Sequence, residues 1–446
     1  STPQEHTVNV EDLILISVDD HVVEPPGMFD NHMTQAELDT IAPRLIEENG
    51  TNFWLYEGHK IGNMGLNAVV GRPKEEYGME PLRYEDMRDG VYSIDARIGD
   101  MDANGILSSI CFPTFPTFAG NLFHQSKDKQ AAKRVIEAYN DWHIDEWAAA
   151  HPGRIIPMAM LPIWDSDLMV AEVKRAVAKG CRAITFPDNP TFHGFPGIHT
   201  PHWDKLWEVC AENDVVINCH IGTGAAPPHS SPETPIDAWI AAFPMSIANS
   251  AADWLYGEFL LKYDNLRISL TEGGVGWVPY FLERAEFTFD HHGAWTKSNF
   301  GGKRPREVFQ EHFLTCFIED ESGLRNRDLV GIDNILFECD YPHSDSTWPV
   351  TPENTFRQLE NVGLSDEEIN KVTHLNAIKY FNFDPIALLG RENCTVGALR
   401  EKAKQAGVDT REKSGGGKSA KVSDRSGRMT SGEVQKLFAG EGAAAD

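Results

Sequence analysis

The chain has 446 residues, with 40 lysine and arginine residues against 67 aspartate and glutamate residues, a formal net charge of −27. So acidic a chain lacks the basic surface that nucleic acid or an anionic membrane requires, and we expect neither as a partner. No run approaches the roughly 18 apolar residues of a membrane-spanning helix, and the first residues lack the pattern of a signal peptide. The seven cysteines are scattered without a Cys-x-x-Cys pair, which is typical of reduced thiols. We therefore expect a cytoplasmic protein.

Short apolar runs alternate with longer amphipathic stretches from residue 100 onward. This alternation is typical of a parallel sheet covered by helices. Eight apolar strands favour a closed (β/α)8 barrel, or TIM barrel, and no Gly-x-Gly-x-x-Gly motif points to an open nucleotide-binding sheet. The predicted strands are Leu13–Val18, Leu107–Phe112, Ile155–Leu161, Cys181–Phe186, Val215–Cys219, Leu266–Leu270, Phe313–Phe317 and Ile335–Cys339.

Two parts of the chain depart from this alternation. Residues 27–100 separate the first two strands and contain short strand-like pieces around turns, so we expect a small inserted β-lobe. Residues 391–446 include a stretch rich in Gly, Ser and Lys, which predicts a C-terminal arm that is partly flexible or contacts another subunit. The barrel domain would span residues 1–390, and we expect a homodimer or homotetramer.

Four predicted strands end in side chains that can bind a metal ion. Asp19 and His21 follow the first strand and lie on one face, because side chains alternate along a strand. His220 follows the fifth strand, Glu272 the sixth and Asp340 the eighth. The carboxyl ends of all barrel strands meet at one mouth, where the active sites of this fold lie. We therefore expect these side chains to lie close together.

Taken singly, each of these residues has an ordinary explanation, because Asp often caps the turn after a strand. Together they are costly to bury unless they are paired or bound to a cation. Two histidines and two aspartates form a nitrogen and oxygen set that suits one Zn²⁺ ion, with Mn²⁺ or Fe²⁺ as alternatives. We predict that Asp19, His21, His220 and Asp340 are the ligands of one divalent metal.

Five segments also resemble a known family: SVDDHVVEPP, GCRAITFPDNP, INCHIGTG, LTEGGVGWVPYFLERAE and FECDYPHSDSTWP. They are similar, in the same order, to the amidohydrolase-2 branch of the amidohydrolase superfamily. That branch includes metal-dependent hydrolases and non-oxidative decarboxylases of the aminocarboxymuconate-semialdehyde and resorcylate types. The resemblance covers Leu13 to Phe383. It implies a metal-dependent enzyme that acts on a small-molecule substrate. The family's ligands fall on Asp19, His21, His220 and Asp340.

The sequence departs from the family pattern at two of these strand ends. The first-strand motif of the family is His-x-His or Glu-x-His, and here Asp19 takes the first position. Many relatives carry a histidine after the sixth strand, where this chain has Glu272, which disfavours a mechanism that needs an imidazole there. The end of the fourth strand, Thr185 to Asp188, has no lysine to bridge a second metal, so we expect one ion.

Our leading hypothesis is hydrolysis of a C–N, C–O or C–C bond next to a carbonyl group of a small, cyclic or aromatic substrate. Asp340 would be the general base, and Glu272 or His343 would protonate the leaving group. An equal alternative for His343 is a loop histidine that bonds a backbone carbonyl. The same ligands would also serve non-oxidative decarboxylation of an aromatic acid, with Asp340 protonating the ring carbon, and this is the second hypothesis.

Other segments near the predicted mouth lead to two further expectations. Residues 50–80 and 187–203 are long excursions that would form the roof of the pocket and select the substrate. The helical stretch after Glu272 places Trp277 and Tyr280 at a spacing typical of core packing.

Overall fold

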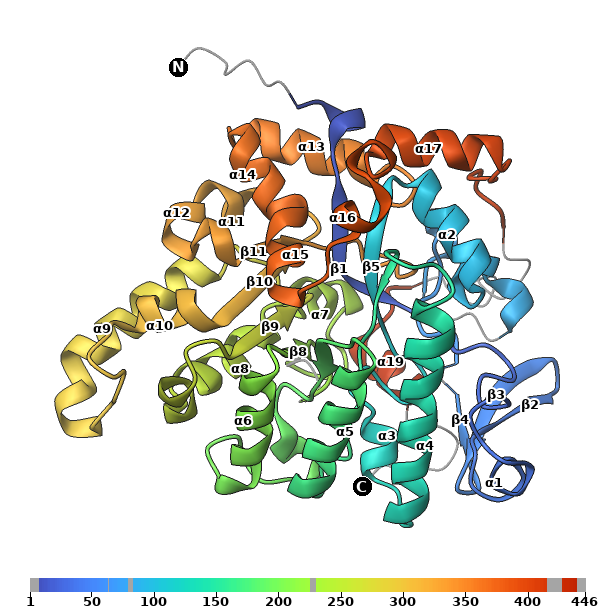
Figure 1. Cartoon of the computed structure of the whole chain (residues 1–446), viewed down its shortest axis with the longest axis horizontal. Coiled ribbons are helices and arrows are strands. Elements are labelled where there is room, and N and C mark those ends of the chain that lie inside the picture. Colours follow the sequence, from blue (N-terminus) through green and yellow to red (C-terminus); the bar gives the residue numbers. More distant parts are fainter. Residues whose placement is uncertain (1–7, 63, 79–82, 225–229, 415–426, 439–446) are drawn as a thin grey trace.

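The computed structural model describes residues 8–62, 64–78, 83–224, 230–414 and 427–438 (Figure 1). Its centre consists of eight parallel strands that are almost wholly buried, and each overlaps one of the eight predicted strand segments. They are β1 (Leu15–His21), β5 (Ile106–Phe112), β6 (Ile155–Ile156), β7 (Ala183–Thr185), β8 (Val216–His220), β9 (Arg267–Thr271), β10 (Phe313–Phe317) and β11 (Ile335–Phe337).

The eight strands follow one another in chain order around a ring. They form two hydrogen-bonded sheets, β1-β5-β6 and β7-β8-β9-β10-β11. A parallel bridge between Ala159 and Ile184 joins the two sheets on one side. On the other side the Asp340 N–H donates to the Asp19 carbonyl at 2.7 Å, which links the residues after β11 to β1. The predicted (β/α)8-barrel fold is therefore confirmed.

An apolar cluster fills the interior of the barrel below the strand ends. It draws one or two side chains from most strands, in the alternating pattern that a barrel interior requires. A second, larger cluster lies between the strands and the surrounding helices. The interior side chains include Ile16, Val18, Ile110, Phe112, Ile156, Ala183, Val216, Leu314, Cys316 and Leu336.

A β-bulge in β1 turns the candidate ligands of that strand toward the interior. From Ser17 to Asp20 the strand advances three residues while its neighbour β5 advances two. Val18 belongs to the interior cluster, and the extra residue lets Asp19 and His21 face inward above it. The Ser17 hydroxyl stabilises the bulge by donating to the Asp19 carbonyl at 3.0 Å.

A buried arginine of helix α2 (Ile94–Ala103) binds β1 on the outer side of the barrel. Arg97 is fully buried and donates to the His21 carbonyl at 2.5 Å. Its guanidinium also lies 4.4 Å from the ring centre of Tyr341. Asp20, on the outer face of β1, accepts the Tyr341 N–H at 2.9 Å. Burial raises the pKa of Asp20 to about 6, against the opposing effect of the Arg97 charge.

Outside the barrel lie a small sheet and the C-terminal segment. The sheet is antiparallel, consists of β2 (Arg44–Glu48), β3 (Thr51–Tyr56) and β4 (His59–Ile61), and lies within the segment where we expected a β-lobe. In the C-terminal segment, α17 (Val396–Gln405) packs against α2. Residues 415–426 and 439–446, on which much of the predicted flexible arm falls, lie outside the described residues.

Helices surround the barrel on all sides in Figure 1. None of the helices in the described residues is long and apolar enough to cross a membrane. The remaining helices are α1 (Gln35–Thr40), α3 (Asn121–His124), α4 (Lys129–Asp141), α5 (Ser166–Ala178), α6 (Asp204–Glu212), α7 (Ile236–Ala242), α8 (Ser246–Leu255), α9 (Val278–Thr296), α10 (Pro305–His312), α11 (Glu321–Arg325), α12 (Arg327–Val330), α13 (Thr351–Asn361), α14 (Asp366–Asn370), α15 (Asn376–Phe381), α16 (Pro385–Leu389) and α19 (Ser431–Phe438).

We expect Arg97→Met to lower the free energy of unfolding by about 3–5 kcal/mol, because it leaves the buried Gly90 and His21 carbonyls without their donor and removes the positive charge near Asp20. Equilibrium urea unfolding measures this loss. Arg325→Met is the matched control, since its partner Glu321 is solvent-exposed and such pairs contribute about 0–1 kcal/mol. Equal losses in the two variants would contradict the role of Arg97.

Candidate metal centre

All six side chains that the sequence singled out for metal binding and catalysis meet at the carboxyl ends of the barrel strands. They come from β1, β8 and the residues that follow β9 and β11. Five of them are buried, and the side chain of the sixth, Glu272, is 15% exposed. The six residues are Asp19, His21, His220, Glu272, Asp340 and His343.

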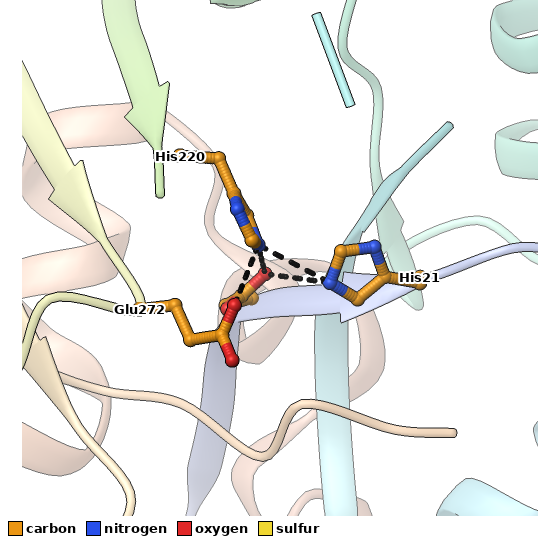
Figure 2. Close-up of side chains that lie close together, drawn as sticks. His21, His220 and Glu272 are labelled. Carbon is orange, nitrogen blue, oxygen red and sulfur yellow. Dashed lines mark hydrogen bonds and ion pairs between the residues drawn. The ribbon is translucent and has the colours of Figure 1, made fainter. Parts of the chain in front are cut away.

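His220 lies at the centre of this group. Its Nε2 is 3.2 Å from Nε2 of His21, 3.3 Å from Oδ1 of Asp19 and 3.2 Å from Oε2 of Glu272 (Figure 2). Its Nδ1 lies 2.6 Å from the carbonyl oxygen of Ile221, a distance that requires Nδ1 to be the donor. With Nδ1 engaged by the Ile221 carbonyl, Nε2 of His220 faces three other potential metal ligands.

Asp340 and His343 extend the group on the side of β11. Oδ1 of Asp340 is 3.3 Å from Nε2 of His21 and 2.9 Å from Nδ1 of His343. Asp340 and Glu272 both have positive φ values, 56° and 59°, so each leaves its strand in the left-handed region. Such backbone costs of order 1–3 kcal/mol and is concentrated at functional sites.

The arrangement of these atoms fits a divalent metal ion. Among the described residues, neither carboxylate oxygen of Asp19 or of Asp340 has a hydrogen-bond donor, and both residues are fully buried. Ligands at ~2.1 Å from one ion lie about 3–3.5 Å apart, which is the spacing seen around His220. A cation would compensate the buried oxygens and the facing imidazole nitrogens. The mixed nitrogen and oxygen donors suit Zn²⁺, Mn²⁺ or Fe²⁺.

The electrostatics of the centre lead to the same conclusion. Burial raises the pKa of Asp19 and that of Asp340 well above the usual range, and neighbouring carboxylates raise both further. Burial lowers the pKa of His21 well below its usual value, so this imidazole is neutral. Without a cation, the carboxylates can remain buried at this distance only by taking up protons.

Sequence reasoning missed two residues that support the centre. Glu338 is buried and accepts the Glu272 N–H at 3.2 Å, and burial raises its pKa to about 8. It lies two positions before Asp340, so strand alternation could have identified it. The ring of Phe118 lies 4.5 Å from the rings of both His21 and His220. No sequence pattern distinguishes Phe118 from other loop aromatics.

A cavity of about 950 Å³ opens beside Glu272, at the ends of β9, β10 and β11. Residues from the first predicted roof segment contribute to it, whereas none of its described lining residues comes from 187–203. The first segment therefore lines this cavity, and the selection of the substrate by the two segments stays a prediction. The cavity's charged and aromatic lining residues are Arg72, Lys74, Tyr77, Glu272, Trp277, Phe317, Glu319, Asp320, Glu338, Asp345, Trp348 and Glu412.

We expect the purified protein to hold about one equivalent of a divalent transition metal per chain, and His220→Ala to lose it, because His220 contacts three of the other candidate ligands. Metal analysis by mass spectrometry measures this. His199→Ala is the control, since His199 pairs with Asp253 on the surface. A wild type that holds no metal and takes up none from added salts would contradict the assignment.

Metal affinity should rise with pH. The carboxyls of Asp19 and Asp340 keep protons above their ordinary pKa of 3.8, and the ion must displace them. Each proton that the ion displaces makes metal binding up to about tenfold tighter per pH unit. This dependence extends from the ordinary carboxyl pKa of 3.8 up to the raised pKa of Asp19 and Asp340. Calorimetric titration of Mn²⁺ in buffers of different ionisation enthalpy measures the release. Affinity and proton count that do not change with pH would contradict this coupling.

Several solved structures resemble the chain. An amidohydrolase from Mycobacterium avium subsp. paratuberculosis K-10 is 19% identical, with a TM-score of 0.62, and the alignment covers 82% of this chain and 99% of that one. A 5-carboxyvanillate decarboxylase from Sphingomonas paucimobilis is 16% identical, with a TM-score of 0.57 and coverage of 83% and 100%. A dihydroxybenzoic acid decarboxylase from Polaromonas sp. JS666, with bound manganese and 2-nitroresorcinol, is 18% identical, with a TM-score of 0.52 and coverage of 82% and 96%.

At these identities the structural likeness establishes the fold alone. None of the curated proteins compared with the sequence matches it. The amidohydrolase family model matches residues 37–383, which include β5 to β11. Because this match extends over most of the chain, the protein belongs to the amidohydrolase family.

Proposed function

We propose that this protein is a metal-dependent hydrolase that cleaves a bond next to a carbonyl group in a small substrate without negative charge. The observation that carries the choice of reaction is the acidic wall of the cavity beside the candidate metal centre. Six acidic and two basic side chains line this cavity among the described residues. The acidic ones are Glu272, Glu319, Asp320, Glu338, Asp345 and Glu412.

The acidic wall disfavours a substrate that carries a carboxylate. Asp345 forms no hydrogen bond or ion pair with the described residues, and its carboxylate lies within 4.8 Å of ligand atoms of Glu272 and Asp340. Of the two basic residues, Arg72 is buried and donates to the Asp86 carbonyl. When a divalent ion is bound, Asp19 and Asp340 balance its charge, and an anion would then lie close to Asp345, which has no partner among the described residues. A neutral amide, lactone or ketone avoids this repulsion.

The residues of the centre supply the proton transfers that hydrolysis needs. When bound, the ion supplies Lewis acidity, which polarises a carbonyl group and makes water easier to deprotonate. Asp340 accepts the proton of the attacking water as general base. His343, whose Nδ1 is 2.9 Å from Asp340, takes the proton on toward the leaving group. Burial lowers the pKa of His343 to about 3, so its imidazole is neutral at rest and readily releases a transferred proton to the leaving group.

The second candidate is non-oxidative decarboxylation of an aromatic acid. It is favoured by the decarboxylases from Sphingomonas paucimobilis and Polaromonas among the similar structures. In that reaction Asp340 would protonate the ring carbon, and Arg72 and Lys74 would have to offset the acidic wall. A substrate panel that pairs neutral esters, lactones and amides with hydroxybenzoic acids separates the two candidates. CO₂ release from an acid without hydrolysis of any neutral compound would replace the first proposal with the second.

Asp340→Asn should reduce turnover of the substrate found in that panel by a factor of roughly 10² to 10⁴, the usual contribution of a general base. Asparagine keeps the shape and one oxygen ligand but cannot accept the proton. Metal content must be measured on the same samples, because metal loss alone would mimic the defect. Glu321→Gln is the control, since Glu321 lies outside the cavity lining and pairs with Arg325 at the surface. Near-normal turnover of a metal-loaded Asp340→Asn enzyme would exclude Asp340 as the base.

A further inference from the structure

Two residues of the C-terminal segment line the cavity beside the candidate metal centre. They are Thr410, which is half-buried, and Glu412, which is exposed, and Glu272 of the centre lines the same cavity. The two residues follow α17, which packs against α2 (Figure 1). They also lie beyond residue 383, where the match to the amidohydrolase family model ends. This part of the cavity therefore comes from outside the region that defines the family.

A partly buried arginine holds the start of this stretch, residues 409–414, which we call the C-terminal rim. Arg88 donates to the Asp409 carbonyl at 3.0 Å and to the carboxylate oxygens of Asp100 at 2.6 and 3.1 Å. Its guanidinium also lies 4.2 Å from the ring centre of Trp348, which lines the cavity. Because a guanidinium is planar and its donors have fixed directions, these contacts leave the backbone at Asp409 little freedom. The rim is thus attached to a side chain of the cavity itself.

The rest of the C-terminal rim contacts the segment inserted between β1 and β5. The Lys413 N–H donates at 2.9 Å to the carbonyl of Gly71, another lining residue. Glu412 lies near Tyr77, whose pKa is raised by burial and raised further by the charge of Glu412. Tyr77 also lines the cavity. The C-terminal rim and the inserted segment therefore adjoin each other in the cavity lining.

The charges of the C-terminal rim are arranged so that a carboxylate lies at the cavity. Asp409 pairs with Arg411 at 2.9 Å and with Lys413 at 3.1 Å. Both cations of the rim are thus engaged by Asp409, and neither is among the described lining residues. Glu412 is the remaining charged side chain of the rim, and it does line the cavity. An anion that approaches this edge therefore meets a negative charge.

We propose that the C-terminal rim selects what enters the cavity: Thr410 limits the size of the ligand, and Glu412 repels anions. The inference rests on the proposed function, because it takes this cavity as the path by which a substrate reaches the ion. The path passes Glu272, whose Oε2 is 3.2 Å from Nε2 of His220. The rim supplies none of the candidate metal ligands among the described residues, so variants of the rim should keep the metal.

Removal of bound zinc by chelators tests the role of Glu412 without a substrate. Dipicolinate is a dianion at neutral pH, whereas 1,10-phenanthroline is neutral, and rates are compared where they rise with chelator concentration. At low salt we expect Glu412→Lys to lose zinc to dipicolinate about three- to tenfold faster than wild type, and high salt to reduce the difference by screening. Loss to phenanthroline should not change. Glu401→Lys is the matched control, since it makes the same charge change on the exposed surface of α17, outside the cavity lining. Equal rates in the two lysine variants would overturn the role of Glu412.

A bulky side chain tests the role of Thr410. We expect Thr410→Trp to slow zinc loss to both chelators about fivefold or more, because the indole fills part of a concave site. Gln405→Trp, on the exposed surface of α17, should leave both rates unchanged. Circular dichroism and zinc content per chain before chelation should match wild type in each variant. Unchanged rates in Thr410→Trp would overturn the rim as a barrier to entry. These rates do not depend on whether the enzyme hydrolyses or decarboxylates its substrate, so failure here is distinguishable from failure of the proposed function.

Discussion

The structure depends on one electrostatic constraint at the mouth of the barrel. Imidazole nitrogens of His21 and His220 face each other at 3.2 Å, and buried carboxylate oxygens of Asp19 and Asp340 lie within 3.5 Å of them. Most of these atoms accept hydrogen bonds, and the described residues supply no donor to the carboxylates. One divalent cation can bind all of these atoms at once. Protons would have to bind each carboxylate separately, and they would remove the negative charge that a general base needs. The rest of the fold can be understood as the scaffold that keeps these atoms together.

Much of that scaffold lies on the outer side of β1. The bulge between Ser17 and Asp20 changes which side chains face inward, and Arg97 ties the strand to the helix behind it. At the ends of β9 and β11, Glu272 and Asp340 adopt left-handed backbone that turns both carboxylates toward the same point. The centre is therefore held by backbone geometry from several elements, and the side chains need little freedom to reach the ion.

The eight-stranded order and the convergence of the six site residues could be predicted from the sequence, because strand ends in a barrel share one face. The bulge in β1 could not, since Ser17, Val18 and Asp19 read as ordinary alternation. Glu338 was predictable in principle from its spacing to Asp340. The contacts of Phe118 and the acidic cavity depend on loop conformations that bring together distant segments, and single-sequence patterns carry no information about those. Tyr280 shows the converse case. Its helix was predicted correctly, but the side chain is 70% exposed, so our expectation that it packs in the core is wrong, because apolar spacing does not distinguish a covered face from an exposed one.

The contact between β1 and the residues after β11, which closes the barrel, has a consequence for folding during synthesis. Asp20 and Tyr341 are bonded across 321 positions, and the same contact brings Asp19 to Asp340. During synthesis the first strand emerges with its ligands and its bulge, but its second neighbour in the ring arrives only after most of the chain has left the ribosome. Until then β1 has an open edge, and the ligands from the two ends of the barrel have not met. An ion that binds both Asp19 and Asp340 would join the first strand to the residues after the last strand. We therefore expect the metal to bind in the last stage of folding.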